Sequence, residues 1–283
     1  MSEKIWFITG ASRGFGRVWT EAALARGDRV AATARDASSI ADLSERYGDA
    51  ILPLQLDVTD GAAVRRAVDE AHRRFSRLDV VLNNAGYALV GAIEEIGEDD
   101  LQAEFDTNVF GMLRVIQAAL PYLREQERGR IVSVSSVAGL VANPIAGAYN
   151  MSKWAVEAMH EALASEVMSF GVRVTLVEPG AYATDFASAT SLKISEGINA
   201  YAELRQHAFA AGAKMSFGDP QATPEALFAI VDSPEPPLRF FLGTEGMPVV
   251  GAAYAARLAE WAAWKELSDA AQGVPSARQM ASP

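Results

Sequence analysis

Short runs of apolar and β-branched residues alternate with longer amphipathic segments along most of the chain. The longer segments carry apolar positions at helical spacing and predict helices at residues 12–26, 60–76, 99–126, 149–170 and 249–271. The short runs predict strands at residues 5–8, 29–33, 51–58, 78–82, 130–134, 172–177 and 238–242. Strands that are apolar throughout and alternate with helices indicate one α/β domain, spanning residues 1–283, built on a doubly wound parallel sheet.

Two segments depart from this alternation. Residues 184–218 show no strand pattern and are expected to form a helical, lid-like insertion between a strand and a helix. Residues 249–283 are expected to form a C-terminal extension, helical to about residue 271 and polar beyond it.

Composition and charge exclude several classes of protein. The 283 residues include no cysteine, so thiol nucleophiles and thiolate metal sites are excluded. Lys and Arg number 25 against 36 Asp and Glu, and this net charge of −11 argues against nucleic acid as a partner. The three histidines lack metal-ligand spacing, so no metal is expected. No apolar stretch is long enough for a transmembrane helix and no signal peptide is visible, which predicts a soluble, cytoplasmic protein without a membrane partner.

A glycine-rich segment lies between the first predicted strand and the first predicted helix. Glycines at such a junction allow a tight turn, so that the helix N-terminus faces a pyrophosphate. A strand-to-helix turn without a ligand is the simpler alternative, but the position in a βαβ unit favours nucleotide binding. The residues expected to bind the cofactor here are Gly10, Ser12, Arg13, Gly14, Phe15 and Gly16.

Five further motifs follow the glycine segment in the chain: Asn83-Asn84-Ala85-Gly86, Asn108, Ser135-Ser136-Val137-Ala138-Gly139, the Y-x-x-x-K pair of Tyr149 and Lys153, and Pro179-Gly180 with Thr184. Together with the spacing G-x-x-x-G-x-G, these motifs resemble the short-chain dehydrogenase/reductase family over about residues 4–185. The resemblance implies a Rossmann-type oxidoreductase with catalytic residues Asn108, Ser136, Tyr149 and Lys153. Ser136 is preferred to Ser135 because it directly precedes Val137-Ala138-Gly139. The resemblance also implies cofactor contacts from Asp57, Val58, Asn84, Ala85, Gly86, Tyr149, Lys153, Pro179, Gly180, Tyr182 and Thr184.

The chemistry of the Tyr149–Lys153 pair agrees with that resemblance. The two residues are four apart and share one face of a helix. A free tyrosine has a pKa of about 10, and a neighbouring ammonium is expected to lower the pKa of Tyr149 by favouring the phenolate. The family implies that Ser136 polarises the substrate carbonyl, that Tyr149 protonates it and that Lys153 holds the nicotinamide ribose. It also implies that Asn108 carries a water that links Lys153 to solvent.

The choice between the two nicotinamide cofactors depends on Arg13, Arg35 and Asp36. An acidic residue about 20 positions after the glycine turn favours NAD, but Ala34 and Arg35 occupy that region. Arg13 and Arg35 suit a 2′-phosphate and favour NADP(H). Asp36 is the feature that favours NAD(H) instead.

The sequence therefore predicts an NADP(H)-dependent enzyme that interconverts a carbonyl and a secondary alcohol. The alternatives are an NAD-dependent alcohol or hydroxysteroid-like dehydrogenase and, more remotely, a non-catalytic NADP-sensing regulator. The apolar surplus on residues 154–163 predicts a homodimer or homotetramer. In the family, the segment after Gly180 covers the substrate. Here that segment is rich in apolar and aromatic residues, which favours an apolar or aromatic ketone as the small-molecule substrate, and packing within the insertion is the alternative use of these residues. They are Tyr182, Phe186, Leu192, Ile194, Ile198, Tyr201 and Phe209.

Overall fold

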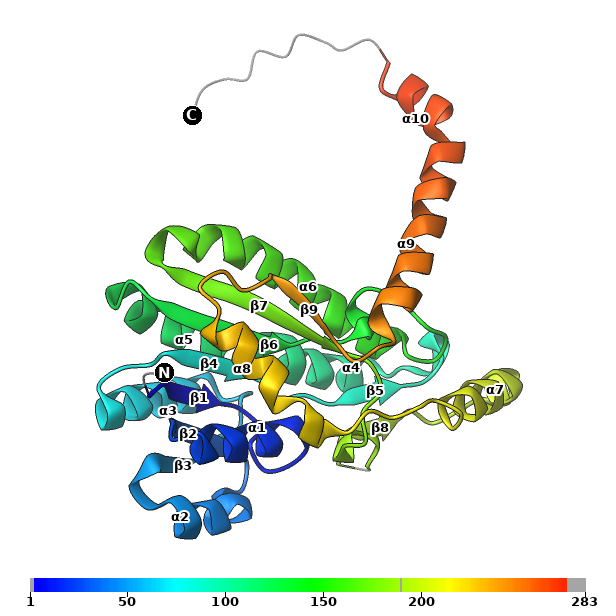
Figure 1. Cartoon of the computed structure of the whole chain (residues 1–283). Coiled ribbons are helices and arrows are strands. Elements are labelled where there is room, and N and C mark those ends of the chain that lie inside the picture. Colours follow the sequence, from blue (N-terminus) through cyan, green and yellow to red (C-terminus); the bar gives the residue numbers. More distant parts are fainter. Residues whose placement is uncertain (1–2, 189, 274–283) are drawn as a thin grey trace.

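The computed structural model describes residues 3–188 and 190–273. Seven parallel strands form one sheet in the order β3-β2-β1-β4-β6-β7-β9 (Figure 1). This order confirms the predicted doubly wound sheet. Its strands are β1 (Ile5–Ile8), β2 (Arg29–Ala34), β3 (Ile51–Gln55), β4 (Val80–Asn83), β6 (Gly129–Val134), β7 (Val172–Pro179) and β9 (Arg239–Leu242).

Helices cover both faces of the sheet. In β1, Ile5 and Phe7 face the layer of α3, α5 and α6, whereas Trp6 and Ile8 face the layer of α1, α2 and α8. Because successive side chains of a strand point to opposite faces, a strand buried on both sides is apolar throughout. The helices are α1 (Gly14–Ala25), α2 (Ala41–Tyr47), α3 (Gly61–Phe75), α4 (Glu98–Phe105), α5 (Met112–Glu125), α6 (Gly147–Val167), α7 (Ala202–Gly212), α8 (Pro224–Asp232), α9 (Gly246–Ala263) and α10 (Lys265–Ala271).

Short helical turns complete the element order. One of them, η4 (Asp106–Gly111), is a π-helix that joins α4 to α5, so the continuous helix predicted at residues 99–126 changes its hydrogen-bonding pattern in the middle. The 3₁₀ turns are η1 (Ala37–Ile40), η2 (Gly48–Ala50), η3 (Ile93–Glu95), η5 (Val137–Gly139), η6 (Met168–Phe170), η7 (Asp185–Ala187), η8 (Asn199–Tyr201) and η9 (Pro220–Ala222).

The insertion at residues 184–218 differs from its prediction. It contains α7 but also a strand, β8 (Leu192–Ile194), which pairs in parallel with β5 (Ala88–Val90) outside the main sheet. The expectation of no strand was wrong because a three-residue strand is too short to show an alternating pattern. This pairing fixes the insertion beside the segment that follows β4.

The C-terminal extension forms an arm that leads away from the sheet (Figure 1). Within α9, Arg257 contacts the body of the domain. It donates to the Leu140 carbonyl at 3.1 Å, and its guanidinium lies 5.0 Å from the Trp154 ring centroid. Residues 274–283 of the predicted extension lie outside the described residues. No helix in the described ranges is long and apolar enough to cross a membrane.

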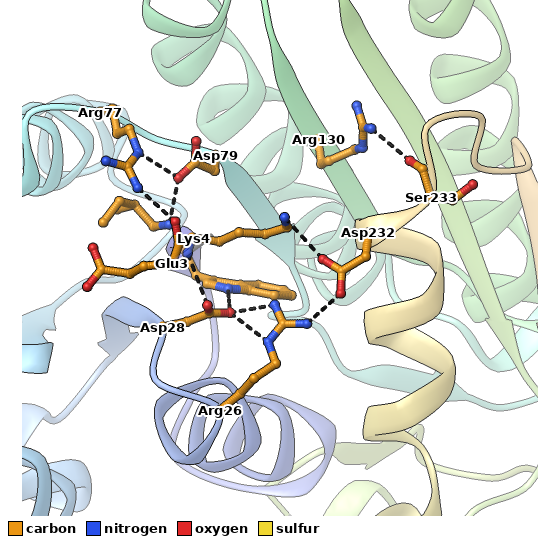
Figure 2. Close-up of polar contacts among 11 residues, drawn as sticks. Glu3, Lys4, Arg26, Asp28, Arg77, Asp79, Arg130, Asp232 and Ser233 are labelled. Carbon is orange, nitrogen blue, oxygen red and sulfur yellow. Dashed lines mark hydrogen bonds and ion pairs between the residues drawn. The ribbon is translucent and has the colours of Figure 1, made fainter. Parts of the chain in front are cut away.

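Charged residues at the amino ends of the strands are paired with one another (Figure 2). Asp28 accepts from the Trp6 indole at 2.8 Å and from Arg26, which also binds Asp232 at 2.8 Å. Lys4 reaches Asp232 at 3.1 Å. Asp28 and Asp232 therefore have partners that connect α1, β1 and α8. We look for the functional site at the opposite edge of the sheet, where the strands have their carboxyl ends.

Candidate active site

The glycine turn lies at the carboxyl end of β1, beside β4, where the strand order reverses. Gly10 and Gly14 have φ values of +69° and +53°, a conformation that L side chains rarely adopt. A Cβ at Gly16 would lie 2.1 Å from the Gly10 carbonyl oxygen, so this position accepts only glycine without rearrangement. The N-cap of α1, Arg13, makes no side-chain cap, and the first turn of α1 contains no acidic residue. The turn therefore fits a bound phosphate group.

Thr9 and Asn84 bind the glycine turn to the end of β4. The Asn84 amide donates to the Thr9 and Gly10 carbonyls, each at 3.1 Å. The Thr9 hydroxyl accepts from the backbone N–H of Asn84 at 2.9 Å and of Ala85 at 3.1 Å. The predicted contacts Gly10, Asn84 and Ala85 thus form one rigid unit, with Thr9 as a member that the predicted site did not include.

Residues after β7 approach the same turn. A Cβ at Gly14 would lie 3.6 Å from the Thr184 Cβ, so Thr184 borders the expected pyrophosphate position. Tyr182 packs edge-on against Phe15 with 5.1 Å between ring centroids, and Phe15 stacks on Trp19 at 4.8 Å. The Phe15 and Tyr182 rings therefore form an aromatic cluster with Trp19.

The residues expected to discriminate between NADP(H) and NAD(H) differ in whether their side chains already have hydrogen-bond partners within the chain. Arg13 donates to the Thr190 carbonyl at 3.1 Å and the Ser191 hydroxyl at 2.8 Å, so its guanidinium holds the insertion. Asp36 accepts from the Ser38 N–H at 2.9 Å and caps η1. Arg35 is exposed and makes no hydrogen bond or ion pair with any residue in the described ranges.

Two neighbouring residues expected to contact the cofactor, Asp57 and Val58, differ in exposure. Asp57 is exposed and accepts from the Thr59 N–H and hydroxyl at 2.9 and 2.8 Å, whereas Val58 is buried beside it. After β7, Gly180 closes against Glu245, whose carboxylate accepts from the Ala181 N–H at 3.0 Å. Pro179 ends β7 itself.

Tyr149, Lys153 and Ser136 meet at the carboxyl ends of β6 and β7. Tyr149 and Lys153 lie one turn apart on α6, and the Lys153 Nζ is 5.7 Å from the Tyr149 ring centroid. Lys153 is buried and donates to the Val134 carbonyl at 2.9 Å. Ser136 is half-buried and caps η5 by accepting from the Ala138 N–H at 3.1 Å, whereas the Ser135 hydroxyl is buried. The contrast in exposure favours Ser136 as the residue that reaches a substrate.

Burial dominates the proton affinities of this group. It raises the pKa of Tyr149, a hydrogen bond with Ser136 opposes the rise, and the charge of Glu104 adds to it. Burial lowers the pKa of Lys153 to about 8, while Glu104 and Glu157 act in the opposite direction. The expectation that Lys153 lowers the pKa of Tyr149 is therefore wrong for the free chain. Tyr149 is held as the protonated hydroxyl, which is the form that donates a proton.

Asn108 lies in the π-helix η4 and is fully buried. Its amide donates to the Tyr87 carbonyl at 2.8 Å and to the Ser152 hydroxyl at 3.1 Å, and its carbonyl accepts from the Tyr87 N–H at 3.0 Å. These contacts hold the segment after Gly86 against α6. The role in carrying a water stays a prediction.

Glu104 is a buried residue near this site that sequence reasoning did not single out. Its Oε1 accepts from the Leu89 N–H at 2.9 Å. The sequence does show a carboxylate one helical turn before Asn108, which could have identified Glu104 as a site residue. It does not show that this carboxylate is buried. Within the described ranges no cluster of metal-ligating side chains is present.

The fold is a doubly wound parallel sheet of the Rossmann type, with the glycine turn and the Tyr149–Lys153 pair at the edge where its strands end. The family model for short chain dehydrogenases matches residues 4–194. A curated relative, the oxidoreductase BOA17 of Botryotinia fuckeliana, is 41% identical over 270 residues, which cover 94% of this chain and 98% of that protein. The 3-ketodihydrosphingosine reductase of Bacteroides thetaiotaomicron is 35% identical over 86% of this chain and 89% of its own length.

A solved structure agrees with these relatives. The crystal structure of a short-chain dehydrogenase from Streptomyces avermitilis matches with a TM-score of 0.88 at 37% identity, covering 95% of this chain and 98% of that one. The chain therefore belongs to the short-chain dehydrogenase family and is an oxidoreductase.

Proposed function

We propose that this chain is an NADP(H)-dependent enzyme that reduces an apolar or aromatic ketone and oxidises the corresponding secondary alcohol. The observation that carries the proposal is the position of Tyr149, which is hydrogen-bonded to the half-buried Ser136 and lies one helical turn from the buried Lys153. An oxygen atom bound at this point meets two hydroxyl donors and a nearby ammonium.

The proposed reaction uses each side chain in one role. A reduced nicotinamide bound at the glycine turn would supply the hydride that the carbonyl carbon accepts. Ser136 donates a hydrogen bond to the carbonyl oxygen and orients it. Tyr149 gives its proton to that oxygen, so the carbonyl becomes an alcohol and Tyr149 becomes a phenolate. The Lys153 ammonium stabilises the phenolate, because opposite charges in a buried site attract strongly.

Arg35 and Asp36 support NADP(H) over NAD(H). Arg35 is exposed with no partner among the described residues, so its guanidinium is available for a 2′-phosphate. The Asp36 carboxylate, which would favour the 2′-hydroxyl of NAD, is already used by Ser38. Arg13 binds the insertion in the free chain, which leaves Arg35 as the principal phosphate ligand.

Phe186 supports an apolar substrate. Its ring centroid lies 5.7 Å from that of Tyr149, and the side chain is 40% exposed. Among the other residues expected to face the substrate, Tyr182 packs in the aromatic cluster and Tyr201 donates to Glu94 at 2.7 Å. The 3-ketodihydrosphingosine reductase relative is named for a ketone substrate, which agrees with this class.

The test is oxidation of NADPH or NADH, followed at 340 nm, against a panel of alkyl and aryl ketones. We expect turnover with NADPH and with apolar ketones, and its loss in Tyr149→Phe. A wild-type protein that oxidises neither cofactor with any ketone, or that prefers NADH, contradicts the proposal.

We also propose that the chain forms a homo-oligomer through the surface around α6. Three apolar side chains there are partly exposed, Phe110 at 48%, Met151 at 47% and Trp154 at 40%. Burying them against a second copy removes apolar area from water. Light scattering should give a mass of two or four chains, and a mass near 30 kDa, that of one chain, contradicts this.

A further inference from the structure

A pair of side chains on one helical face clamps the segment after β4. Asn108 binds both backbone groups of Tyr87, and Glu104, four residues earlier, accepts from the N–H of Leu89. The spacing matches on both sides: Glu104 and Asn108 are one helical turn apart, and Tyr87 and Leu89 are alternate residues of the segment that they bind. A Cβ at Gly86, at the start of this segment, would lie 2.9 Å from the Asn108 Oδ1 and 3.9 Å from the Lys153 Nζ. The clamp therefore reaches the catalytic lysine.

The backbone N–H of Leu89 needs only a hydrogen-bond acceptor, and a neutral amide oxygen would serve. At this position the chain has the carboxyl group of Glu104 instead. Its side chain is fully buried, and its Oε2 is a buried oxygen without a hydrogen-bond partner in the described ranges. Burying a carboxylate with one free oxygen is costly. Burial raises the pKa of Glu104 to about 7, the Leu89 N–H and the charge of Lys153 oppose the rise, and the carboxyl titrates close to neutral pH.

The charge of Glu104 acts on three titratable groups. Tyr149 and Lys153 come from α6 and belong to the proposed reaction centre, and Tyr87 comes from the clamped segment. Of the two carboxylates that act on Lys153, Glu157 is paired with Arg239 at 3.0 Å. His160, the next titratable group along α6, is buried and hydrogen-bonded to Ser133 and Val156. Glu104 is therefore the less neutralised of the two carboxylates.

We propose that Glu104 is a positioning residue whose negative charge keeps the proton on both Lys153 and Tyr149 and so adapts the site to ketone reduction near neutral pH. This inference rests on the proposed function. An anion favours the ammonium over the neutral amine and disfavours a phenolate, so one charge acts on both groups in the same sense. Protonated Tyr149 and charged Lys153 are the forms that reduction requires.

Two variants separate the charge of Glu104 from its hydrogen bond. Glu104→Gln keeps an acceptor for the Leu89 N–H but removes the charge, whereas Glu104→Leu removes both. With either variant the pH above which ketone reduction declines should fall by about one pH unit. Only Glu104→Leu should also raise the KM for ketone and lower the Tm, because the clamp on Leu89 is lost. Glu98→Gln, an exposed carboxylate on the same helix, is the matched control and should leave the profile unchanged.

A measurement without turnover keeps this inference separate from the proposed function. The Nζ signal of Lys153 in protein labelled with ¹⁵N-lysine, assigned with Lys153→Arg, reports its pKa in the free chain. We expect a midpoint near pH 8 in wild type and a midpoint about one pH unit lower in Glu104→Gln. A midpoint that is the same in both proteins overturns the inference even if the ketone reaction is found. A shifted midpoint supports the effect on Lys153 even if the tested ketones are not reduced.

Discussion

Replacing Gly16 with alanine should weaken cofactor binding, because the added methyl group has no space. Its Cβ would lie 2.1 Å from the Gly10 carbonyl oxygen and 2.5 Å from the Asn84 amide nitrogen. Contacts below 3.0 Å are essentially never seen for a real Cβ, so the two backbone segments must separate by about 1 Å at the glycine turn. Such overpacking costs about 1–3 kcal/mol of stability.

The same displacement acts on the cofactor through the turn. Asn84 donates to the Thr9 and Gly10 carbonyls, so movement of Gly10 also disturbs the end of β4. Loss of one hydrogen bond from the turn to a charged phosphate costs about 1.5–3 kcal/mol, which is roughly ten- to a hundredfold in Kd. We therefore expect the Kd for NADPH to rise about ten- to a hundredfold in Gly16→Ala, measured by NADPH fluorescence, with a lower midpoint in urea.

Gly251→Ala is the matched control for this substitution. Gly251 lies inside α9, and a Cβ there meets nothing within 4 Å. Alanine in a helix interior is favoured over glycine by up to about 1 kcal/mol, so this variant should bind NADPH normally and be slightly more stable. A Gly16→Ala protein that binds NADPH within threefold of wild type would refute the account of the glycine turn.

Two further predictions concern charge. Arg35→Ala should weaken NADPH binding about ten- to a hundredfold and leave NADH binding nearly unchanged, since a charge-assisted contact to phosphate is lost; equal losses for both cofactors contradict the assignment. Glu178 lies in β7 and is fully buried, and this burial raises the pKa of its carboxyl to about 8. The folded chain holds this proton more tightly than the unfolded chain, so the contribution to stability is complete below about pH 4.5 and is lost as the pH rises through 8. Glu178→Gln should therefore raise the free energy of unfolding by about 2–4 kcal/mol more at pH 9 than at pH 6, measured in urea, and an equal effect at both pH values speaks against this account.

The parallel sheet was predictable because its strands are buried on both faces and therefore apolar throughout. Trp6 and Phe7 illustrate this, since they are neighbours in sequence and pack against opposite helical layers. The strand β8 was not predictable because it pairs through backbone groups over only three residues, and no side-chain pattern records that pairing. The π-helix at Asn108 is likewise a property of backbone hydrogen bonds.

The candidate site was predictable where the chemistry depends on residue type and spacing. Tyr149 and Lys153 lie on one face of α6 as their spacing indicates. The direction of the pKa shift of Tyr149 was not predictable from the sequence. Burial of the hydroxyl outweighs the neighbouring ammonium, and that burial depends on the whole fold. Glu104 was not identified for the same reason, since an Asp or Glu in an amphipathic helix is ordinarily exposed to solvent.

The central claim is that Tyr149 is the proton donor of an NADPH-dependent ketone reduction. The most direct test compares wild type and Tyr149→Phe in NADPH oxidation with the best ketone of the panel, together with the Kd for NADPH of each protein. We predict a kcat lower by about 10²–10⁴-fold in Tyr149→Phe with an unchanged Kd, because only the hydroxyl is removed. A Tyr149→Phe protein that keeps the wild-type kcat would contradict the account.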